Sequence, residues 1–488
     1  MSTATENTFQ AIISHAKEYD FVFQSSEIYD GLSAVYDYGP YGSELKKNIK
    51  DFWWKSMTQM HQNIVGIDAA IFMHPTTWKA SGHVDNFSDP MIDNKDSQKR
   101  YRVDHLIEAK ADQLTEAGKE AEAKALIESM EQLLAAEDFV GLKQLLTDHQ
   151  IVCSVSGTSN WTEIRQFNLM FSTQLGSVAE DSDTIYLRPE TAQGIFVNFL
   201  NVQKTARMKI PFGIAQTGKA FRNEIVARQF IFRMREFEQM EMQFFVRPGT
   251  QMEWYNYWKE ERLNWHLSLG LPASKYRYHD HVKLAHYADA ALDIEYEFPF
   301  GFKEVEGIHS RTDFDLKSHQ EYSKKKQQYF DNDIDETTGK PFGNYIPYVV
   351  ETSIGLDRMF LLILSHAYTE ETINKEDGTT DSRVVLKIPA KIAPNKLAIL
   401  PLVKKDGLPE IARELMDDCK GSFKCFYEEK DAIGKRYRRQ DAIGTPFCVT
   451  IDHQTKEDQM VTIRYRDSML QERIPLSKVK ELVLSHIN

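Results

Sequence analysis

Alternating polar and apolar residues between Ala220 and Phe245 predict two β-strands joined by a short loop. Period-two spacing puts Ala220, Arg222 and Glu224 on one face of the first strand. We expect the returning strand to pair antiparallel with the first and to place its apolar side chains in the core. Its other face would carry Arg233, Arg235, Phe237, Gln239, Glu241 and Gln243.

A sheet face of this composition suits a ligand that combines phosphate groups with a flat ring. Guanidinium groups grip phosphate oxygens in a forked geometry, an aromatic ring stacks, and a carboxylate accepts hydrogen bonds from an amine. The alternative offered by the residues alone is a surface hairpin held together by salt bridges.

Elsewhere, periodicity predicts the order of the elements. A helix at residues 42–60 leads into a strand that we expect to end at Pro75. Residues 104–150 lack proline and are rich in Ala, Leu, Glu and Lys, which predicts a mostly solvated helical insertion. Residues 368–395 are polar and are expected to connect two domains. Beyond them, strands and helices alternate.

Length, net charge and cysteine content exclude only a few classes of protein. A chain of 488 residues with a net charge of −13 can hold two or three domains and is too acidic for a general nucleic-acid coat. Residues 395–488 nevertheless carry a slight excess of basic side chains, which is compatible with selective RNA contact. Four cysteines without framework spacing, no membrane-length apolar run and no signal peptide predict a cytoplasmic protein.

Two motifs carry a resemblance to a known family. FRNE at residues 221–224, followed by the spacing RxxxFxxxE, resembles motif 2 of class II aminoacyl-tRNA synthetases, and GLDR at residues 355–358 resembles their motif 3. Two motifs in the family's order are far more specific than either one alone. LRPETAQGIF (187–196) and EFEQMEMQFF (236–245) further resemble the homodimeric glycyl-tRNA synthetases, and the resemblance spans nearly the whole chain.

The resemblance implies an α+β fold in which residues 1–390 form a class II catalytic domain, an antiparallel sheet flanked by helices. The insertion at residues 104–150 lies within this domain, and residues 395–488 form a C-terminal α/β anticodon-binding domain. The segment that ends at Pro75 resembles motif 1, which in the family forms much of a homodimer interface. In the tail, four basic residues would meet tRNA phosphates or else form a solvated basic turn: Lys435, Arg436, Arg438 and Arg439.

The resemblance also implies the reaction. Such an enzyme, a glycine–tRNA ligase, joins the glycine carboxylate to the α-phosphate of ATP, releases pyrophosphate, and transfers glycine to the 3′ end of tRNA(Gly). A further implied activity is the synthesis of dinucleoside polyphosphates. Because the carboxylate is itself the nucleophile, no side-chain base is needed, and catalysis rests on alignment and on neutralising phosphate charge.

The family's ATP contacts can be carried over onto this chain. Arg222 would hold the α-phosphate and the glycine carboxylate, and Glu224 would face the adenine amino group. Phe237 would stack on adenine, with Arg358 over its other face and reaching the γ-phosphate. The expected ATP-binding residues are Arg222, Asn223, Glu224, Phe232, Arg233, Met234, Arg235, Glu236, Phe237, Glu304, Val305, Gly355, Leu356, Asp357 and Arg358.

A magnesium ion is expected with ATP, because a hard carboxylate suits a cation that bridges phosphates through few protein ligands. Arg222, Arg358 and Glu304 would therefore be the catalytic residues, with Glu304 as the magnesium ligand. Glu306 competes for that role, since it lies two residues away and period two puts it on the same strand face.

Glycine has no side chain to grip, so its pocket must capture an ammonium group and exclude anything larger. Three carboxylates, from Glu190, Glu241 and Glu351, would raise one another's pKa unless a cation intervenes. Arg311 would offset this charge or steer the substrate carboxylate. The expected glycine-binding residues are Arg102, Glu190, Phe237, Glu238, Gln239, Met240, Glu241, Arg311, Glu351, Thr352, Ser353, Ile354 and Gly355.

The chain departs from the family pattern in two places. Many relatives carry a C-x-x-C sequence where this chain has CSVS at residues 153–156, so we expect no structural zinc there. Motif 3 reads ETSIG where EPSxG is more usual, which removes a proline restraint next to Glu351 and Ser353.

Two other classes remain to be weighed. A catalytically inactive relative, such as the accessory subunit of mitochondrial DNA polymerase, would have lost the catalytic motif residues, whereas Arg222, Glu224, Phe237 and Arg358 are all present. A threonyl or prolyl synthetase would need residues that read a side chain, and the threonyl enzyme would also need a zinc-binding set. RPETAQG and FEQME favour glycine instead.

Overall fold

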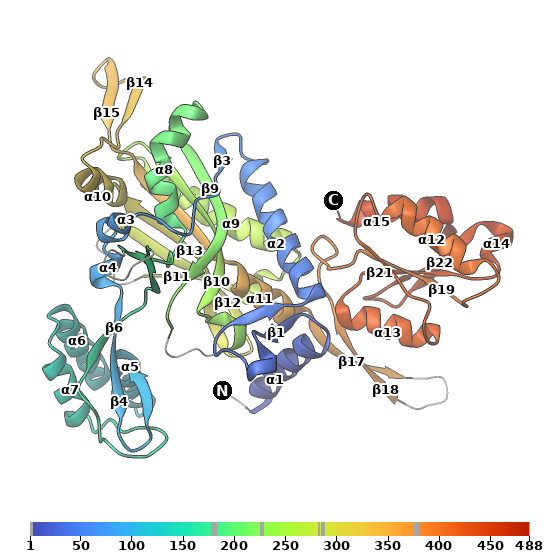
Figure 1. The fold of residues 1–488 in the computed structure, drawn as a ribbon, viewed down its shortest axis with the longest axis horizontal. Helices are drawn as coiled ribbons and strands as arrows, with labels where there is room; N and C mark the ends of the chain where they lie inside the picture. Colours follow the sequence, from blue (N-terminus) through green and yellow to red (C-terminus); the bar gives the residue numbers. More distant parts are fainter. Residues whose placement is uncertain are drawn as a thin grey trace. The chain divides into compact units, whose positions relative to one another are not determined.

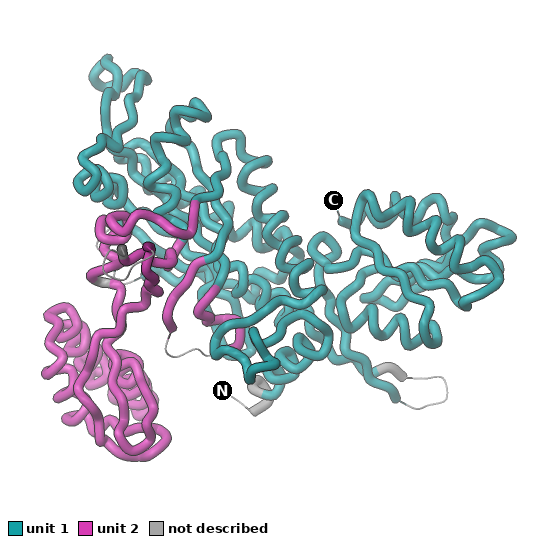
Figure 2. The backbone as a smooth tube through the Cα atoms, in the orientation of Figure 1, with its two compact units in different colours: residues 1–69, 191–219, 237–488 teal, residues 70–190, 220–236 magenta. Residues whose placement is uncertain are grey.

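The computed structural model describes residues 3–176, 183–224, 229–281, 284, 288–374 and 380–487. Contacts divide the chain into two compact units, which Figure 2 distinguishes by colour. Unit 1 comprises residues 1–69, 191–219 and 237–488, and unit 2 comprises residues 70–190 and 220–236.

A seven-stranded sheet forms the centre of unit 1 (Figure 1). Its strand order is β11-β12-β13-β16-β10-β9-β3, and β3 pairs in parallel with β9 whereas the pairs from β11 to β10 are antiparallel. The predicted antiparallel sheet is therefore confirmed. The strands are β3 (Ile64–Gly66), β9 (Phe212–Phe221), β10 (Glu236–Val246), β11 (Tyr276–Asp280), β12 (Ala290–Phe298), β13 (Gly301–Thr312) and β16 (Tyr348–Gly355).

Helices flank this sheet. Helix α11 (Leu356–Ala367) is apolar almost all the way round and is correspondingly buried, beginning directly where β16 ends. It contacts α2 (Pro40–Thr58), whose first residue is a proline, a favoured residue at a helix start. The remaining helices of this part are α1 (Thr3–Glu18), α8 (Ala192–Thr205), α9 (Gln251–Ser268) and α10 (Phe314–Ser323).

Short two-stranded pairs complete the body of unit 1. They are β1 (Val22–Gln24) with β2 (Tyr36–Tyr38), and β14 (Tyr329–Asp335) with β15 (Lys340–Tyr345). Residues 368–395, expected to be a plain connection, contain a third antiparallel pair, β17 (Tyr368–Asn374) with β18 (Thr380–Leu386). Residues 375–379 lie outside the described residues.

The C-terminal part of unit 1 is the predicted alternation of strands and helices. Five strands in the order β20-β19-β21-β22-β23 form a sheet, parallel among the first three and antiparallel among the last three. The core of this part buries Ile399, Leu415 and Val449, which come from two strands and a helix. The elements are β19 (Leu397–Pro401), α12 (Leu408–Cys419), β20 (Cys425–Tyr427), α13 (Ile433–Ile443), β21 (Phe447–Ile451), α14 (Thr455–Asp458), β22 (Met460–Tyr465), β23 (Gln471–Pro475) and α15 (Val479–Ile487).

Unit 2 contains the helices expected in residues 104–150, namely α5 (Val103–Glu116), α6 (Glu120–Ala135) and α7 (Phe139–Asp148). More than half of residues 104–150 are exposed, while Ile107, Leu126 and Leu142 share a small core of their own with Trp161. A three-stranded antiparallel sheet, β5-β4-β6, belongs to the same unit. The other elements are α3 (Pro75–Ala80), α4 (His83–Asn86), β4 (Ser88–Asn94), β5 (Lys99–Arg102), β6 (Arg165–Asn168), β7 (Ser172–Leu175) and β8 (Asp183–Tyr186).

Two predicted strand boundaries are wrong. Strand β9 ends at Phe221 and β10 begins at Glu236, so the arginines between them lie outside the strands. Gln229 and Phe230 both have positive φ angles, which breaks an extended run, and a 3-10 turn follows at Phe230–Phe232. Residues 225–228 lie outside the described residues. The strand expected to end at Pro75 already ends at Gly66, and Pro75 begins α3.

Candidate functional site

Two rows of side chains cross the seven-stranded sheet on one face. Directly opposite residues share a face, so the strand register puts Asp293, Gly307, Ser353 and Glu241 in one row. The next row, two residues along each strand, comprises Ala291, His309, Glu351 and Gln243. Glu241, Glu351 and Ser353, all predicted to bind glycine, therefore occupy adjacent positions on the same face.

Glu241 is almost fully buried and is held by hydrogen bonds at both carboxylate oxygens. Gln243 donates to Oε1 at 2.7 Å, and the Thr191 hydroxyl donates to Oε2. The neighbouring Gln239 side chain donates to the Ser353 hydroxyl at 3.3 Å. A carboxylate oxygen has a second lone pair, so both bonds leave Glu241 able to accept from an ammonium group.

Glu351 is buried among cationic and polar partners. Arg311 donates to Oε2 at 3.0 Å, Gln243 donates to the same oxygen at 2.6 Å, and His309 Nδ1 lies 2.8 Å from Oε1. Burial alone would raise the pKa of Glu351, but Arg311 and then His309 and Gln243 outweigh it and lower that pKa to about 2. A cation thus already intervenes at Glu351, because Arg311 and its other partners favour its ionised form.

Arg311 also forms a bidentate pair with Asp315, at 2.9 and 3.2 Å. Its guanidinium is thus shared between two buried carboxylates, which supports the charge-offsetting alternative over steering of a substrate carboxylate.

The first turn of α11 brings motif 3 next to β13. Arg358 Nη1 lies 2.8 Å from Glu304 Oε2, and Arg358 also donates to the Glu304 carbonyl oxygen at 3.3 Å. The Glu304 side chain is 45% exposed, so its carboxylate can reach a ligand from solvent. Val305 beside it is buried and offers only its backbone.

Glu306 is not available to bind magnesium. It is completely buried, where Arg262 Nε lies 2.6 Å from Oε1 and His266 Nε2 lies 2.9 Å from Oε2. The strand pairing shifts register between Glu304 and Glu306, because Val305 is an extra residue opposite Ile294 and Glu295. This bulge breaks the period-two alternation, so the prediction that the two glutamates share a face is wrong.

Glu238 and Asp357, both among the predicted ligands, belong to a buried network. The Asp357 carboxylate accepts from Lys46 Nζ at 2.7 Å, from the Glu238 backbone N–H at 2.7 Å and from the Tyr38 hydroxyl. Lys46 and Lys50 also pair with the Glu238 carboxylate, at 3.3 and 2.7 Å. These contacts join α2, β10 and α11, so both carboxylates position elements of the fold.

The predicted residues between Arg222 and Glu236 fall in unit 2, as do Arg102 and Glu190, whereas Phe237 belongs to unit 1. Arg222 Nε donates to the Pro189 carbonyl oxygen at 3.1 Å, and its guanidinium lies 5.5 Å from the centre of the Phe87 ring. Its backbone N–H donates to the Arg235 carbonyl oxygen at 2.9 Å, while Arg235 Nε donates to the Glu224 carbonyl oxygen at 3.1 Å. These bonds tie together the two ends of the loop that the sequence predicted to be strand.

Arg102 lies between two carboxylates of unit 2. Its Nη1 is 3.1 Å from Asp89 Oδ2, and its other nitrogens form a bidentate pair with Asp104. Burial raises the pKa of Asp89, and the negative charges of Asp104 and Glu224 add to this, while Arg102 and Arg233 oppose it. Glu190 pairs with His83 at 3.4 Å. Within unit 2, the charges of Arg102, Glu224 and Arg233 therefore all act on Asp89.

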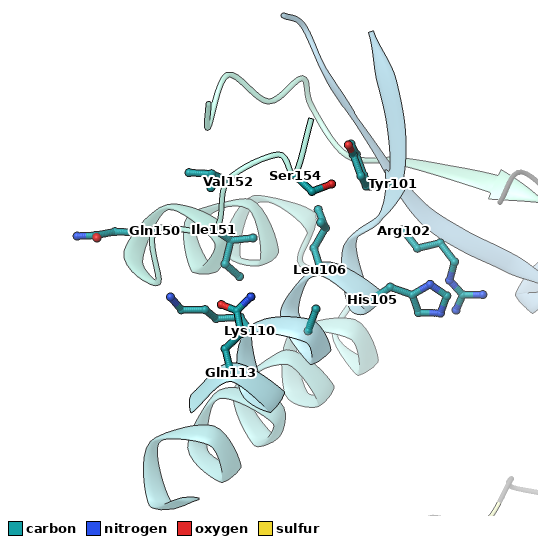
Figure 3. A pocket seen from close by; sticks show the side chains of 11 residues that line it. Tyr101, Arg102, His105, Leu106, Lys110, Gln113, Gln150, Ile151, Val152 and Ser154 are labelled. Atoms are coloured by element: carbon teal, nitrogen blue, oxygen red, sulfur yellow. The ribbon is translucent and has the colours of Figure 1, made fainter. Parts of the chain in front are cut away.

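Cys153, where relatives of the family carry a C-x-x-C sequence, accepts weak hydrogen bonds from the Tyr101 hydroxyl at 3.0 Å and the Ser97 hydroxyl at 3.3 Å. Figure 3 shows Tyr101 and Ser154 beside a cavity that Lys110 and Gln113 also line. The volume of this cavity is about 280 Å³. Burial raises the pKa of the Cys153 thiol, but hydrogen bonds from Ser156, Ser97 and Tyr101 outweigh it and lower that pKa to about 6.

In the C-terminal part, Arg436 is wrongly predicted to contact tRNA. It is 1% exposed and donates to the carbonyl oxygens of Pro401, Glu428 and Leu402 at 2.8, 3.0 and 3.2 Å. Lys435, the preceding residue, is exposed. In this basic segment, Arg436 thus holds backbone carbonyl groups inside the fold, whereas Lys435 lies on the surface.

Three side chains that hold the sheet residues were not among the predicted ligands: Thr191, Gln243 and His309. Gln243 stood on the predicted polar face of its strand, so the same alternation that selected Glu241 could have selected it. His309 lies two residues before Arg311, which was selected. Thr191 directly follows Glu190 in the RPETAQG motif, so that motif could have selected it, although its contact with Glu241 joins residues 50 positions apart.

Comparisons with known proteins agree along the whole chain. A family model described as an anticodon binding domain matches residues 396–486, and one described as glycyl-tRNA synthetase insertion domain 1 matches residues 89–126 and 117–169. A glycine--tRNA ligase from Chlorobaculum tepidum is 55% identical over 98% of this chain and 99% of its own length. Those from Treponema denticola and Macrococcus caseolyticus are each 50% identical, over 98% and 97% of this chain and 97% and 98% of their own lengths. With identity of this degree along nearly its full length, the chain belongs to the glycine--tRNA ligase family of class II aminoacyl-tRNA synthetases.

Proposed function

We propose that this chain activates glycine with ATP and transfers the glycyl group to the 3′ end of tRNA(Gly). The observation that carries the proposal is the row of Glu241 and Ser353 on the sheet, in a chain at least half identical to glycine--tRNA ligases. A buried carboxylate next to a hydroxyl suits the ammonium group of a small amino acid.

In the first step, a carboxylate oxygen of glycine attacks the α-phosphorus of ATP. The new O–P bond forms as the bond to the β-phosphate oxygen breaks, and pyrophosphate leaves with the electron pair. We assign Arg222 to the α-phosphate and the glycine carboxylate, Glu224 and Phe237 to adenine, and Arg358 to adenine and the γ-phosphate. Their part is to align the reactants and to neutralise charge that develops on the phosphates.

ATP brings magnesium to the site as part of the substrate, and Glu304 fits this ion. Its carboxylate is a hard oxygen donor that reaches solvent, and its present partner Arg358 is itself a phosphate-binding group. We propose that the nucleotide exchanges this ion pair for two contacts, from Glu304 to magnesium and from Arg358 to phosphate.

Glycine selectivity would come from the crowded face around Glu241. The ammonium group would bind Glu241 and Ser353. Gln243 and Gln239, which donate hydrogen bonds to these two residues, would crowd out a larger amino acid. A pocket gains no binding energy from the absence of a methyl group. Glycine is therefore selected by steric exclusion of amino acids with a larger side chain. Glu190, Arg102 and Glu351 are also assigned to glycine.

We further propose that residues 1–390 act as the catalytic domain, with residues 104–150 inserted, and that residues 395–488 bind the anticodon region of tRNA. The slight excess of basic side chains in the tail supports this division. None of the described helices has the length and apolar character that a membrane span needs. We place the protein in the cytoplasm, where tRNA is charged, and we propose that it acts as a homodimer.

The test is ATP–pyrophosphate exchange by the purified chain, with magnesium and with glycine, alanine, serine, threonine or proline in turn. Exchange that depends on glycine alone is the expected result. A folded protein that binds tRNA but exchanges with no amino acid would instead be a binding subunit, and exchange with another amino acid would overturn the assignment of the pocket.

A further inference from the structure

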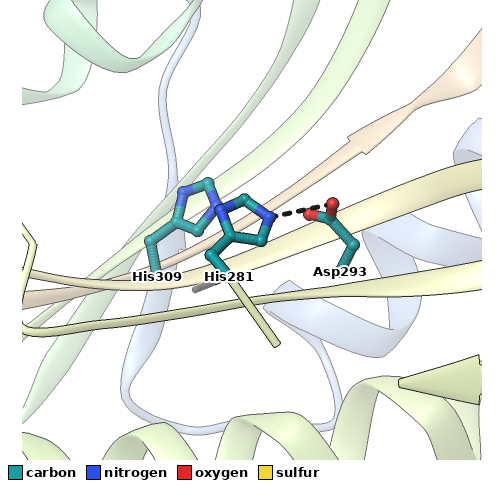
Figure 4. A group of neighbouring side chains, drawn as sticks. All are labelled: His281, Asp293 and His309. Atoms are coloured by element: carbon teal, nitrogen blue, oxygen red, sulfur yellow. Dashed lines mark hydrogen bonds and ion pairs between the residues drawn. The ribbon is translucent and has the colours of Figure 1, made fainter. Parts of the chain in front are cut away.

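Three metal-ligating side chains converge on the sheet outside the residues assigned so far. His281, Asp293 and His309 each offer one ligand atom, and these atoms all lie within 4.8 Å of one another (Figure 4). All three side chains are half-buried. They are contributed by consecutive neighbours in the sheet, since Asp293 lies on β12, His309 on β13, and His281 directly follows β11.

The strand register explains why the two imidazoles approach each other. The His281 backbone N–H donates to the Ala291 carbonyl oxygen at 3.0 Å, which continues the pairing of β11 with β12. Ala291 in turn pairs with His309. A small residue thus separates the two histidines, and their ring centres lie 5.8 Å apart. The arrangement is fixed by backbone pairing rather than by flexible side chains.

His309 is oriented as a metal ligand commonly is. Its Nδ1 lies 2.8 Å from Glu351 Oε1, so this hydrogen bond selects the other ring nitrogen, Nε2, as the ligand atom. Metal-bound histidines usually give their second nitrogen to a carboxylate, which fixes the tautomer and the ring orientation. Glu351 is itself immobilised by Arg311 and Gln243.

Asp293 contributes the carboxylate of the group, and its ligand oxygen lies within 4.8 Å of a ring nitrogen of each histidine. His281 Nε2 lies 2.9 Å from Asp293 Oδ2, and this pair alone would be an ordinary partly buried contact. The pairing of His281 with Asp293 does not explain why a second imidazole, that of His309, also lies near the Asp293 carboxylate. Glu351 already orients this second ring.

We propose that His281, Asp293 and His309 bind a divalent transition metal ion of the zinc class. Two imidazoles and one carboxylate suit zinc and its neighbours in the first row, whereas magnesium prefers oxygen ligands alone. The site is thus chemically distinct from Glu304, which we assign to the magnesium that accompanies ATP. Three protein ligands leave room for water to complete the coordination shell.

The ion would fasten together three adjacent strands and hold His309 against Glu351. We therefore assign it a positioning role beside the proposed glycine pocket. The proposal concerns metal binding alone, so its test is a binding measurement that stands whether or not the chain activates glycine.

The experiment starts from the full-length protein after treatment with a chelator and removal of the chelate. Zinc chloride is then titrated in the presence of a chromophoric zinc chelator, which reports the competition. We expect one zinc ion per chain, and we expect His281→Gln, Asp293→Asn and His309→Gln each to weaken binding by about tenfold or more. Circular dichroism establishes that each variant is folded.

His279→Gln is the matched control, because His279 lies on β11 two residues before His281 but its exposed ring pairs with Glu295 at 3.3 Å. This variant should bind zinc like the unaltered protein. Cobalt chloride provides a second measurement, since a visible spectrum without a thiolate charge-transfer band would indicate nitrogen and oxygen ligands. No saturable uptake, equal uptake by all folded variants, or a thiolate band that points to Cys153 would each overturn the proposal.

Discussion

Arg358 and Glu304 form an ion pair, with 2.8 Å between Nη1 and Oε2, that joins the first turn of α11 to β13. Glu304 is assigned to the magnesium ion of MgATP and Arg358 to its adenine and γ-phosphate. In the absence of nucleotide, the two side chains neutralise each other's charge. The pair keeps two phosphate-site groups ordered at a partly exposed position until the substrate replaces both contacts.

Replacing Glu304 by Gln should therefore impair the nucleotide step. The variant loses a magnesium ligand and the charge that orders Arg358, and loss of one such electrostatic contact costs roughly a hundredfold in rate. We expect kcat/KM for ATP in pyrophosphate exchange to fall by about this factor, and the magnesium concentration for half-maximal rate to rise. Glu297→Gln, which removes an exposed partner of Lys275, is the control. Unchanged kinetics in Glu304→Gln would refute the assignment.

Glu306, only two residues away, should behave in the opposite manner. Glu306→Gln leaves Arg262 buried without its counter-charge, and breaking such a pair costs about 3–5 kcal/mol of unfolding free energy. Urea unfolding should show this loss, while KM for ATP of the folded enzyme stays within a factor of about two. A stable variant with altered magnesium dependence would mean that Glu306, not Glu304, meets the ion.

Glu351 should give the protein a characteristic acid sensitivity. Its folded-state pKa of about 2 lies below the ordinary value of 4.5, so its ionised form contributes stability at neutral pH. That contribution is lost as the pH falls from about 4.5 toward 2, because the unfolded chain takes up the proton first.

We accordingly expect Glu351→Gln to lose roughly 3 kcal/mol of unfolding free energy at pH 7. The gap between the two proteins should narrow as the pH is lowered from 4.5 toward 2. Urea unfolding across this range measures both quantities, with the exposed Glu253→Gln as a control that should follow the unaltered protein. A gap that does not depend on pH would contradict the ionised state that Arg311 and His309 favour.

The sequence could predict those features of the site that depend only on residues close together in the chain. Period-two alternation correctly selected Gln239, Glu241 and Gln243 as one polar face, because alternation is a property of any regular strand. The same rule failed for Glu304 and Glu306, since a bulge at Val305 leaves no mark in the residue pattern.

Interactions between residues far apart in the sequence were the second kind of feature that could not be predicted. The sequence contains no sign that Arg262 meets Glu306 across 44 positions, or that Arg436 turns inward to bind carbonyl oxygens. A run of basic residues has the same sequence whether its arginines face solvent or the core. Only the tertiary fold separates these cases, and it also decides which carboxylates are free to meet a substrate.

The contrast between Lys435 and Arg436 yields a prediction for the tail. Lys435→Ala removes an exposed charge, so we expect a several-fold rise in KM for tRNA in aminoacylation with unchanged pyrophosphate exchange. Arg436→Ala leaves three backbone carbonyls without their donor and should lower the melting temperature instead. A tRNA defect in a normally stable Arg436→Ala protein would restore Arg436 as a direct contact.

Glu241→Gln tests the glycine pocket itself. The amide can still accept the hydrogen bond from Gln243 or Thr191, but it no longer offers a negative charge to the substrate ammonium group. A hydrogen bond to a charged group is worth about 1.5–3 kcal/mol, so KM for glycine should rise by about 10- to 100-fold. KM for ATP should stay nearly constant, because Glu241 has no part in the nucleotide site. Equal rises in both constants would indicate a general distortion of the sheet, and no change in KM for glycine would remove Glu241 from the pocket.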